Sequence, residues 1–168
     1  NALIAKIPKY TKNDFVSVEV DIDNYQFSTA IKAREDIHGW FDWEELYKNV
    51  LFDAPTGAHF VEVGSWMGKS ACFMAEHIKQ YNFQVKFDCI DIWDDSSVEP
   101  AYMDMINKAT SEGLDMLGLF KSNLNRHGVL NYVNPIKSTS VNAVKKYGDN
   151  TLDFVFVDAA HDFDSVLD

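Results

Sequence analysis

The sequence predicts an α/β fold with a doubly wound, mostly parallel sheet that carries helices on both faces. Three observations lead to this prediction: four short apolar runs are typical of strands, helical patterns separate them, and a glycine loop follows the first run. Strand–helix alternation at this spacing is typical of βαβ units. The 168 residues, 46% of them apolar, are enough for one domain with a hydrophobic core.

The predicted strands are HFVEV at 59–63, KFDCID at 86–91, YVNPIK at 132–137 and DFVFVD at 153–158. The first, second and fourth are continuous apolar segments that end on or just before an acidic residue or a glycine, as buried parallel strands do. The third contains Pro135, which lacks a backbone N–H, so we expect it near a sheet edge. Chain order places the fourth strand beside the first, on the side away from the second.

Helical patterns cover 42–52, 69–80, two segments within 99–126, and 141–147. In the first of them Asp42 is the predicted N-cap, with Glu44 and Glu45 in the first turn. Ahead of it, the segment FVSVEVDID alternates apolar and acidic residues and predicts a short edge strand.

We divide the chain into an N-terminal extension, residues 1–38, and one Rossmann-like domain, residues 39–168. The domain is expected to be C-terminally incomplete, because DFVFVD would otherwise be an apolar strand with an open edge. Further strands beyond Asp168, or another chain in a homo-oligomer, would cover that edge.

The composition excludes several kinds of partner. A net charge of −11 repels phosphate backbones, so no nucleic-acid partner is expected. No apolar run reaches the roughly 18 residues that a membrane-spanning helix needs, so no membrane partner is expected either. Cys72 and Cys89 lie in apolar contexts and are predicted to be core residues, which fits a reducing, cytoplasmic location.

The glycine loop is the most informative segment. In FVEVGSWMGKSACFMA, Gly64 follows the strand and Gly68 lies at the helix start. The first glycine permits a backbone conformation that a Cβ forbids, and the second allows a ligand or the strand to approach the helix closely. The free N–H groups at the helix start, with Ser65 and Ser70, are suited to a ligand's carboxylate, and Glu62 to an ammonium or ribose.

This loop has four possible interpretations. A nicotinamide fingerprint needs glycine where Trp66 stands, and a phosphate loop needs four residues between its glycines, where this sequence has three. The methyltransferase pattern E-x-G-x-x-x-G fits at every position. A purely structural glycine turn remains open.

An acidic residue about twenty residues after such a loop, at the end of the next strand, is suited to hold ribose hydroxyls. Asp91 lies there, 23 residues after Gly68. Its two carboxylate oxygens accept both hydroxyls at once. Ile92 and Trp93 follow it and are predicted to pack against the adenine. The alternative is that Asp91 is a helix cap or a solvated loop residue.

The fourth strand leads into an acid–histidine pair, Asp158 and His161. The strand order places Asp158 in the same crevice as Gly64. A carboxylate there is able to bind a divalent cation, and a neutral imidazole is able to take a proton from a hydroxyl nucleophile. The alternative is a helix-capping aspartate and a surface histidine.

Taken together, VEVGSWMGKS and DFVFVDAAH resemble the small-molecule class I O-methyltransferases that use S-adenosylmethionine. The chain is similar to catechol-type enzymes and closer to the sugar and antibiotic O-methyltransferases of the macrocin type. The resemblance covers residues 39 to 168 and implies a Rossmann-like fold, S-adenosylmethionine as cofactor, and a small-molecule hydroxyl acceptor.

The resemblance also assigns site residues. It implies that the methionine part of the cofactor is bound by the glycine-loop residues Glu62, Gly64, Ser65, Trp66, Gly68 and Ser70. Asp91 matches the ribose acid, Ile92 lies beside the adenine, and Ser140 lines the adenine pocket. Asp158 matches the first ligand of Mg²⁺ or another divalent cation in metal-dependent members, and His161 falls where the family carries its catalytic base.

The resulting hypothesis is methyl transfer from S-adenosylmethionine to a hydroxyl of a small molecule such as a sugar or natural product, with or without a divalent cation. Two other classes stay open. The chain could be a nucleotide-binding phosphotransferase-like domain, or a non-catalytic Rossmann-type partner subunit that keeps the pocket without turnover.

Overall fold

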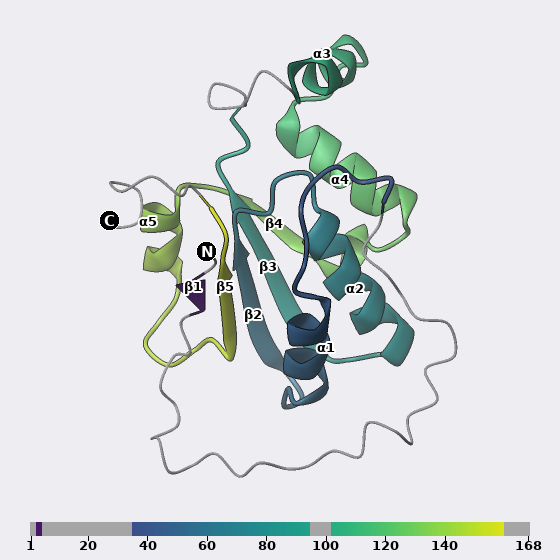
Figure 1. The fold of residues 1–168 in the computed structure, drawn as a ribbon. Coiled ribbons are helices and arrows are strands. Elements are labelled where there is room, and N and C mark those ends of the chain that lie inside the picture. The colour runs from purple at the N-terminus through teal and green to yellow at the C-terminus, as the bar shows by residue number, and fades with distance from the viewer. Residues whose placement is uncertain (1–2, 5–34, 95–101, 160–168) are drawn as a thin grey trace.

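The computed structural model describes residues 3–4, 35–94 and 102–159. The predicted edge strand FVSVEVDID and the candidate base His161 lie outside these ranges. Within them the chain forms one five-stranded sheet with helices on both faces, so the predicted α/β class is confirmed (Figure 1).

The sheet has the strand order β1-β5-β2-β3-β4. The strands are β1 (Leu3–Ile4), β2 (Ala58–Val63), β3 (Val85–Asp91), β4 (Asn134–Lys137) and β5 (Phe154–Val157). The last four are mutually parallel, and β5 pairs with β2 on the side away from β3, as the chain order predicts. The strand with Pro135, β4, lies at the edge of the sheet.

The outer edge of β5 is paired in part. Strand β1 runs antiparallel to it, with Leu3 opposite Val157 and Ile4 opposite Phe156. Two residues of the predicted N-terminal extension therefore belong to the sheet.

The α-helices are α1 (Glu44–Phe52), α2 (Lys69–Tyr81), α3 (Met103–Ser111), α4 (Met116–Arg126) and α5 (Ser140–Ala143), with 3₁₀ turns η4 (Leu130–Tyr132) and η5 (Val144–Lys146). The predicted N-cap Asp42 is wrong: the N-cap of α1 is Trp43, whose side chain makes no capping hydrogen bond. The helix predicted at 141–147 is one α-helical turn continued as 3₁₀. The strand predicted at 132–137 is β4, and it begins at Asn134 because Tyr132 belongs to η4.

The alternation of side chains along the strands separates two apolar clusters. Helices α1, α2 and α4 cover one side of the sheet (Figure 1). Phe60 and Phe87 belong to the large core on that side. Val61 and Ile90 face the other side, where Ala143 of α5 packs on them.

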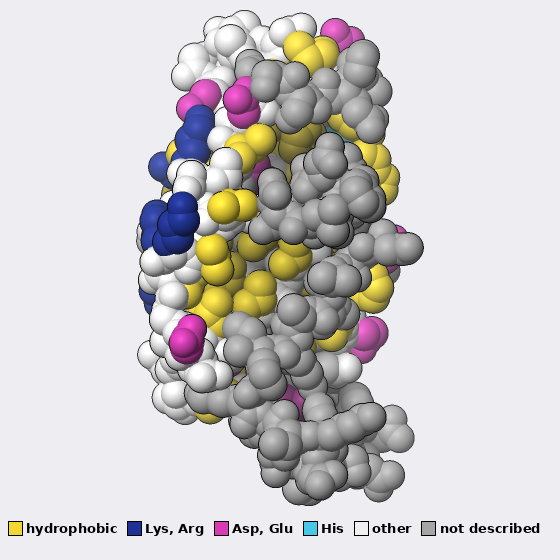
Figure 2. Space-filling model, turned by 90° about the vertical axis from the view of Figure 1, so that its left-hand side faces the viewer, with side chains coloured by type: hydrophobic (Ala, Val, Ile, Leu, Met, Phe, Trp, Pro, Cys, Tyr) yellow, Lys and Arg dark blue, Asp and Glu magenta, His cyan; other side chains and the backbone are white. Residues whose placement is uncertain are grey.

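The α5 side is covered less completely by the described residues. Seen toward that side, hydrophobic side chains gather over the middle of the surface (Figure 2). In α5 and η5, Val141 and Val144 are exposed. None of the helices in the described ranges combines the length and apolarity that crossing a membrane requires.

Candidate functional site

The glycine loop lies where the carboxyl ends of three strands meet. The backbone N–H of Gly64 donates to the Ile90 carbonyl of β3 (2.8 Å), and the N–H of Asp158 donates to the Val63 carbonyl of β2 (2.9 Å). Gly64 has a φ of +90°, and a Cβ there would lie 2.2 Å from the Asp158 carbonyl oxygen. Glycine is therefore required, because the end of β5 passes directly over this residue.

Gly68 is required by the packing of a neighbouring helix, and its predicted contact with a ligand stays a prediction. A Cβ on it would lie 2.5 Å from Leu124 Cδ1 of α4 and 2.9 Å from Phe120 Cδ2. Its φ is also +90°. The second glycine thus lets α4 pack against the start of α2.

We expect Gly68→Ala to lower the free energy of unfolding by about 3 kcal/mol, because left-handed strain and overpacking each cost about 1–2 kcal/mol. Gly57→Ala is the matched control, since Gly57 has a φ of +82° and nothing within 4 Å of a Cβ. It should lose only the strain, measured by urea denaturation. Equal losses in the two variants would contradict close packing of α4 on Gly68.

Asp91, at the end of β3, joins this loop to the strand. Its Oδ2 accepts a hydrogen bond from the Trp66 backbone N–H (2.9 Å), and its Oδ1 accepts one from the Trp93 N–H (2.8 Å). A carboxylate has about four acceptor positions, so each oxygen retains one. Asp91 is therefore held in a fixed orientation at the site and can still accept from ribose hydroxyls.

The two tryptophans beside Asp91 are linked to each other. The indole Nε1–H of Trp93 donates to the Trp66 carbonyl (2.8 Å). Trp93 is 3% exposed, and the centroid of its ring lies 4.9 Å from the ring centroid of Phe120. Trp93 is thus largely a core residue that also lines the pocket beside Ile92, and its predicted contact with the adenine stays a prediction. Ile92, between Asp91 and Trp93, is 43% exposed and free to contact a ligand.

A pocket of about 930 Å³ opens beside Ile92. Its apolar walls come from the β3–α3 loop, α3 and α4, and they include Ile92, Ile106, Leu114 and Met116. Ser138 and Thr139, which follow β4, supply hydroxyl groups to the same pocket. Ser140, the residue predicted from the sequence, is exposed at the start of α5 and does not line it. The charged residues Asp94, Asp115 and Lys137 also line it, so the pocket combines apolar walls with polar groups. Such a combination is suited to a purine ring.

Glu62 is the buried acid of the site, 1% exposed at the end of β2. Its Oε2 accepts from the Tyr47 hydroxyl (2.6 Å). Burial raises the pKa of Glu62, and the neighbouring hydroxyls of Tyr47, Ser65 and Ser70 oppose that rise without cancelling it.

The Ser65 hydroxyl lies close enough to Glu62 to lower the pKa of that carboxyl, yet no hydrogen bond of regular geometry joins the buried atoms Glu62 Oε1 and Ser65 Oγ to a described residue. Buried polar groups are normally paired, so these atoms mark a place where a ligand's donor would be accepted. A cationic ammonium fits best, because it would also stabilise the charged form of Glu62.

Asp158 lies half-buried directly after β5, with its backbone against Gly64. Within the described ranges, one group of three potential metal ligands comes together, and Asp158 does not belong to it. That group is Cys72, Glu76 and His127, whose ligand atoms lie within 4.8 Å of one another between α2 and the end of α4. Among the described residues Asp158 is therefore not part of a candidate group of metal ligands, and we derive no step through a metal.

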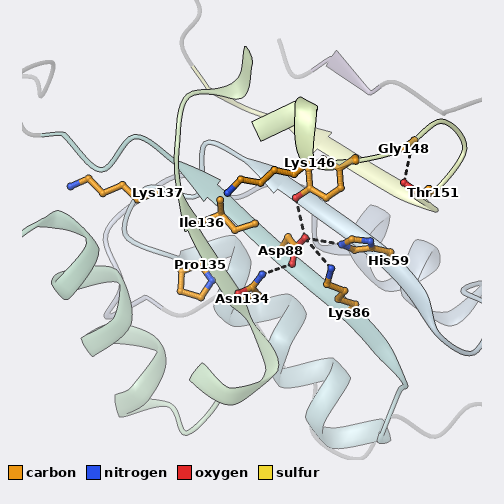
Figure 3. Close-up of a pocket in the computed structure, with 11 residues that line it drawn as sticks. His59, Lys86, Asp88, Asn134, Pro135, Ile136, Lys137, Lys146, Gly148 and Thr151 are labelled. Atoms are coloured by element: carbon orange, nitrogen blue, oxygen red, sulfur yellow. Dashed lines mark hydrogen bonds and ion pairs between the residues drawn. The ribbon is translucent and has the colours of Figure 1, made fainter. Parts of the chain in front are cut away.

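A second cavity, of about 720 Å³, lies on the α5 side of the sheet, where the sequence analysis predicts no site. On its floor the buried carboxylate of Asp88 accepts from Asn134 Nδ2 (2.8 Å) and Tyr147 Oη (3.0 Å) and contacts His59 Nε2 (2.7 Å) (Figure 3). These groups connect β2, β3, β4 and the turn after η5.

Comparisons with known proteins agree with this geometry. A family model described as a methyltransferase domain matches residues 61–168, more than half of the chain. The matched range begins within β2 and includes the glycine loop, Asp91 and Asp158. A comparison with curated proteins finds no match. The chain therefore belongs to this family of methyltransferase domains, whose general methyl donor is S-adenosylmethionine.

Proposed function

We propose that this chain transfers a methyl group from S-adenosylmethionine to a hydroxyl of a small molecule, as an O-methyltransferase whose domain spans residues 39–168. The observation that carries the proposal is the arrangement at the carboxyl edge of the sheet. Three groups follow one another along this edge. They are the buried atoms Glu62 Oε1 and Ser65 Oγ, which lack a regular hydrogen bond, the oriented carboxylate of Asp91, and the pocket beside Ile92. The ammonium, the ribose and the adenine of S-adenosylmethionine would be bound by these three groups in that order.

Each part of the cofactor has proposed ligands. Glu62, Ser65 and Ser70, with the backbone of Gly64, Trp66 and Gly68, would hold the methionine part. Asp91 would accept from the ribose hydroxyls, and Ile92 would lie against the adenine. Ser138 and Thr139 take the place proposed for Ser140 from the sequence, because they line the pocket and Ser140 does not.

The cofactor supplies an activated methyl group, and the protein supplies alignment. Holding the acceptor oxygen in line with the methyl carbon contributes up to about 7–11 kcal/mol. As the carbon–oxygen bond forms and the carbon–sulfur bond breaks, the hydroxyl proton has to leave. We propose that His161 takes it and that Asp158 assists as a neighbouring carboxylate.

The test is calorimetric titration of S-adenosylhomocysteine into the purified protein, with Mg-ATP and NAD as controls. We expect micromolar binding of S-adenosylhomocysteine alone. Tight Mg-ATP binding without it would favour the phosphotransferase-like alternative. Cofactor binding with no effect of Asp158 or His161 substitutions on any methyl transfer would favour a non-catalytic partner subunit.

Asp91→Ala should weaken S-adenosylhomocysteine binding by about 1–3 kcal/mol, because hydrogen bonds to a charged group are lost. Asp153→Ala is the matched control, since Asp153 also accepts from a backbone N–H, that of His59, but at the opposite end of β2. It should leave binding unchanged. Equal affinities of the two variants would remove Asp91 from the proposed site.

Divalent-metal assistance at Asp158 is tested separately. If a cation acts there, a chelator should suppress methyl transfer and added Mg²⁺ should restore it. Indifference to the chelator would leave proton removal by His161 as the proposed assistance.

A further inference from the structure

Three side chains with metal-binding atoms come together where the end of α4 meets α2. Cys72 and Glu76 are four residues apart on α2, so they lie on the same face of that helix. His127 is the C-cap of α4, and α4 packs against α2 on the same side of the sheet (Figure 1). The ligand atoms of the three residues all lie within 4.8 Å of one another. An ion placed between them would be bound from both helices.

The spacing of these atoms is close to that of a tetrahedral metal site. Around a Zn²⁺ ion with bonds of roughly 2.0–2.3 Å, neighbouring ligand atoms lie roughly 3.3–3.8 Å apart. The observed limit of 4.8 Å therefore leaves roughly 1 Å to be closed. Rotation about side-chain torsions supplies a movement of that size.

The surroundings suit a metal ion better than an organic ligand. Cys72 is 0% exposed and Glu76 7%, and the side chain of His127 is 13% exposed. An organic molecule has no access to such atoms, whereas metal sites are commonly closed because the ion is taken up as the chain folds. A dication bound there would also balance the charges of a buried thiolate and a buried carboxylate.

His127 is oriented in the way that is typical of metal-binding histidines. Its Nε2 contacts Asp36 Oδ2 (2.9 Å), and Arg126 Nη2 lies 3.2 Å from the same oxygen. Metal-bound histidines almost always donate their other ring N–H to a carboxylate or carbonyl, which fixes the orientation of the ring. The contact with Asp36 leaves Nδ1 of His127 as the ligand nitrogen.

The same place borders the glycine loop. The backbone N–H of Cys72 donates to the Gly68 carbonyl (2.8 Å) in the first turn of α2. From α4, Asn123 Nδ2 donates to the Met67 carbonyl (2.9 Å), and the Asn123 carbonyl accepts from the N–H of His127 (3.4 Å). An ion bound by Cys72 and His127 would therefore join the two helices that contact the end of this loop.

From these observations we propose that Cys72, Glu76 and His127 bind a Zn²⁺ ion that joins α2 to α4, with water in the fourth position. A thiolate and an imidazole select Zn²⁺ over Mg²⁺, which takes oxygen ligands. The Cys72 thiol releases its proton to solvent when it coordinates, so the affinity rises with pH. This site is separate from Asp158 and does not depend on the proposed methyl transfer.

The test adds Co²⁺, a spectroscopic substitute for Zn²⁺, to the purified protein after treatment with a chelator. We expect a thiolate-to-cobalt charge-transfer band in the near ultraviolet, and this band should vanish when Zn²⁺ displaces Co²⁺. Excess Mg²⁺ should leave it in place. Cys72→Ser should abolish the band, whereas Cys89→Ser, the matched control at the other buried cysteine, should retain it.

A second variant tests the site without changing a ligand or the core. Asp36→Ala, at a side chain that is 51% exposed, should weaken Zn²⁺ binding about 10–100-fold in competition with a chelating dye. Asp42→Ala removes another exposed acid ahead of α1 and should leave the affinity unchanged.

Three results would overturn the proposal: no charge-transfer band in the wild type, a band that survives Cys72→Ser, or displacement of Co²⁺ by Mg²⁺ as readily as by Zn²⁺. None of them bears on methyl transfer, because the titration of S-adenosylhomocysteine tests that function separately.

Discussion

Replacing Glu62 by glutamine is expected to stabilise the protein at neutral pH while weakening cofactor binding. Burial raises the pKa of this carboxyl, so its charged form is less favourable in the folded than in the unfolded chain. The folded state therefore loses stability as pH rises through the two pKa values. A neutral amide avoids this cost, and we expect a gain of about 1 kcal/mol in urea denaturation. The gain should shrink toward acidic pH, where the wild-type carboxyl is also neutral.

The effect on binding has the opposite sign. An ammonium bound beside Glu62 favours the charged carboxylate, and a hydrogen bond between charged groups contributes about 1.5–3 kcal/mol. We expect Glu62→Gln to lower the affinity for S-adenosylhomocysteine by about ten- to a hundredfold. In the wild type the affinity should rise with pH through the raised pKa of Glu62. Calorimetry in two buffers of different ionisation enthalpy should detect the release of a proton.

Glu45→Gln, the same change at an exposed position on α1, is the control and should alter neither property. If Glu62→Gln lowered stability and left affinity and its pH dependence unchanged, Glu62 would be only the structural partner of Tyr47. That outcome would remove the ammonium site from the proposal without affecting Asp91 or the adenine pocket.

The parts of the fold that sequence predicts well are those whose signal is local. Continuous apolar runs locate β2, β3 and β5 to within one residue, because a parallel strand covered on both faces consists mostly of apolar residues. Pro135 correctly predicts an edge strand, since it has no N–H to donate. The N-cap of α1 was misplaced because Asp42 has the right chemistry but the chain enters the helix one residue later.

Within the candidate site, spacing alone predicted that Asp91 and the glycine loop would meet. It could not indicate that both oxygens of Asp91 accept from backbone N–H groups of tryptophans. Gly68 shows the same limit: its need for glycine comes from Leu124, a residue of another helix. Cys72 and Glu76 lie one helical turn apart, so the sequence alone places them on the same face of α2. Nothing in the sequence indicates that His127 lies beside them.

The Asp88 network is the largest feature that sequence reasoning missed. Its partners His59, Asn134 and Tyr147 are 29, 46 and 59 residues away in the chain. Only the pairing of β2, β3 and β4 brings them to one place on the α5 side of the sheet (Figure 3). A single aspartate within a buried strand carries no pattern from which this could be read.

Removing this carboxylate is expected to cost more stability than any other substitution considered above. Asp88→Ala leaves the exposed amide of Asn134, the half-buried hydroxyl of Tyr147 and the half-buried His59 ring without the carboxylate that they contact, and hydrogen bonds to a charged group contribute about 1.5–3 kcal/mol each. We expect the free energy of unfolding to fall by about 4 kcal/mol at neutral pH. Affinity for S-adenosylhomocysteine, measured below the melting transition, should be unchanged because Asp88 faces away from Glu62 and its loop.

The pH dependence of this effect has a definite sign. Burial acts to raise the pKa of Asp88, but hydrogen bonds from Asn134, His59 and Tyr147 outweigh it and hold the pKa below its usual value of 3.8. A group whose pKa is depressed in the folded state stabilises that state above its unfolded pKa and loses this contribution as the pH falls through the folded value. The stability difference between wild type and Asp88→Ala should therefore narrow below about pH 4.

Asp149→Ala, at an exposed turn, serves as the control and should show no such convergence. A difference that stays constant from neutral pH into the acid range would mean that the charge of Asp88 is not what joins the turn after η5 to the sheet.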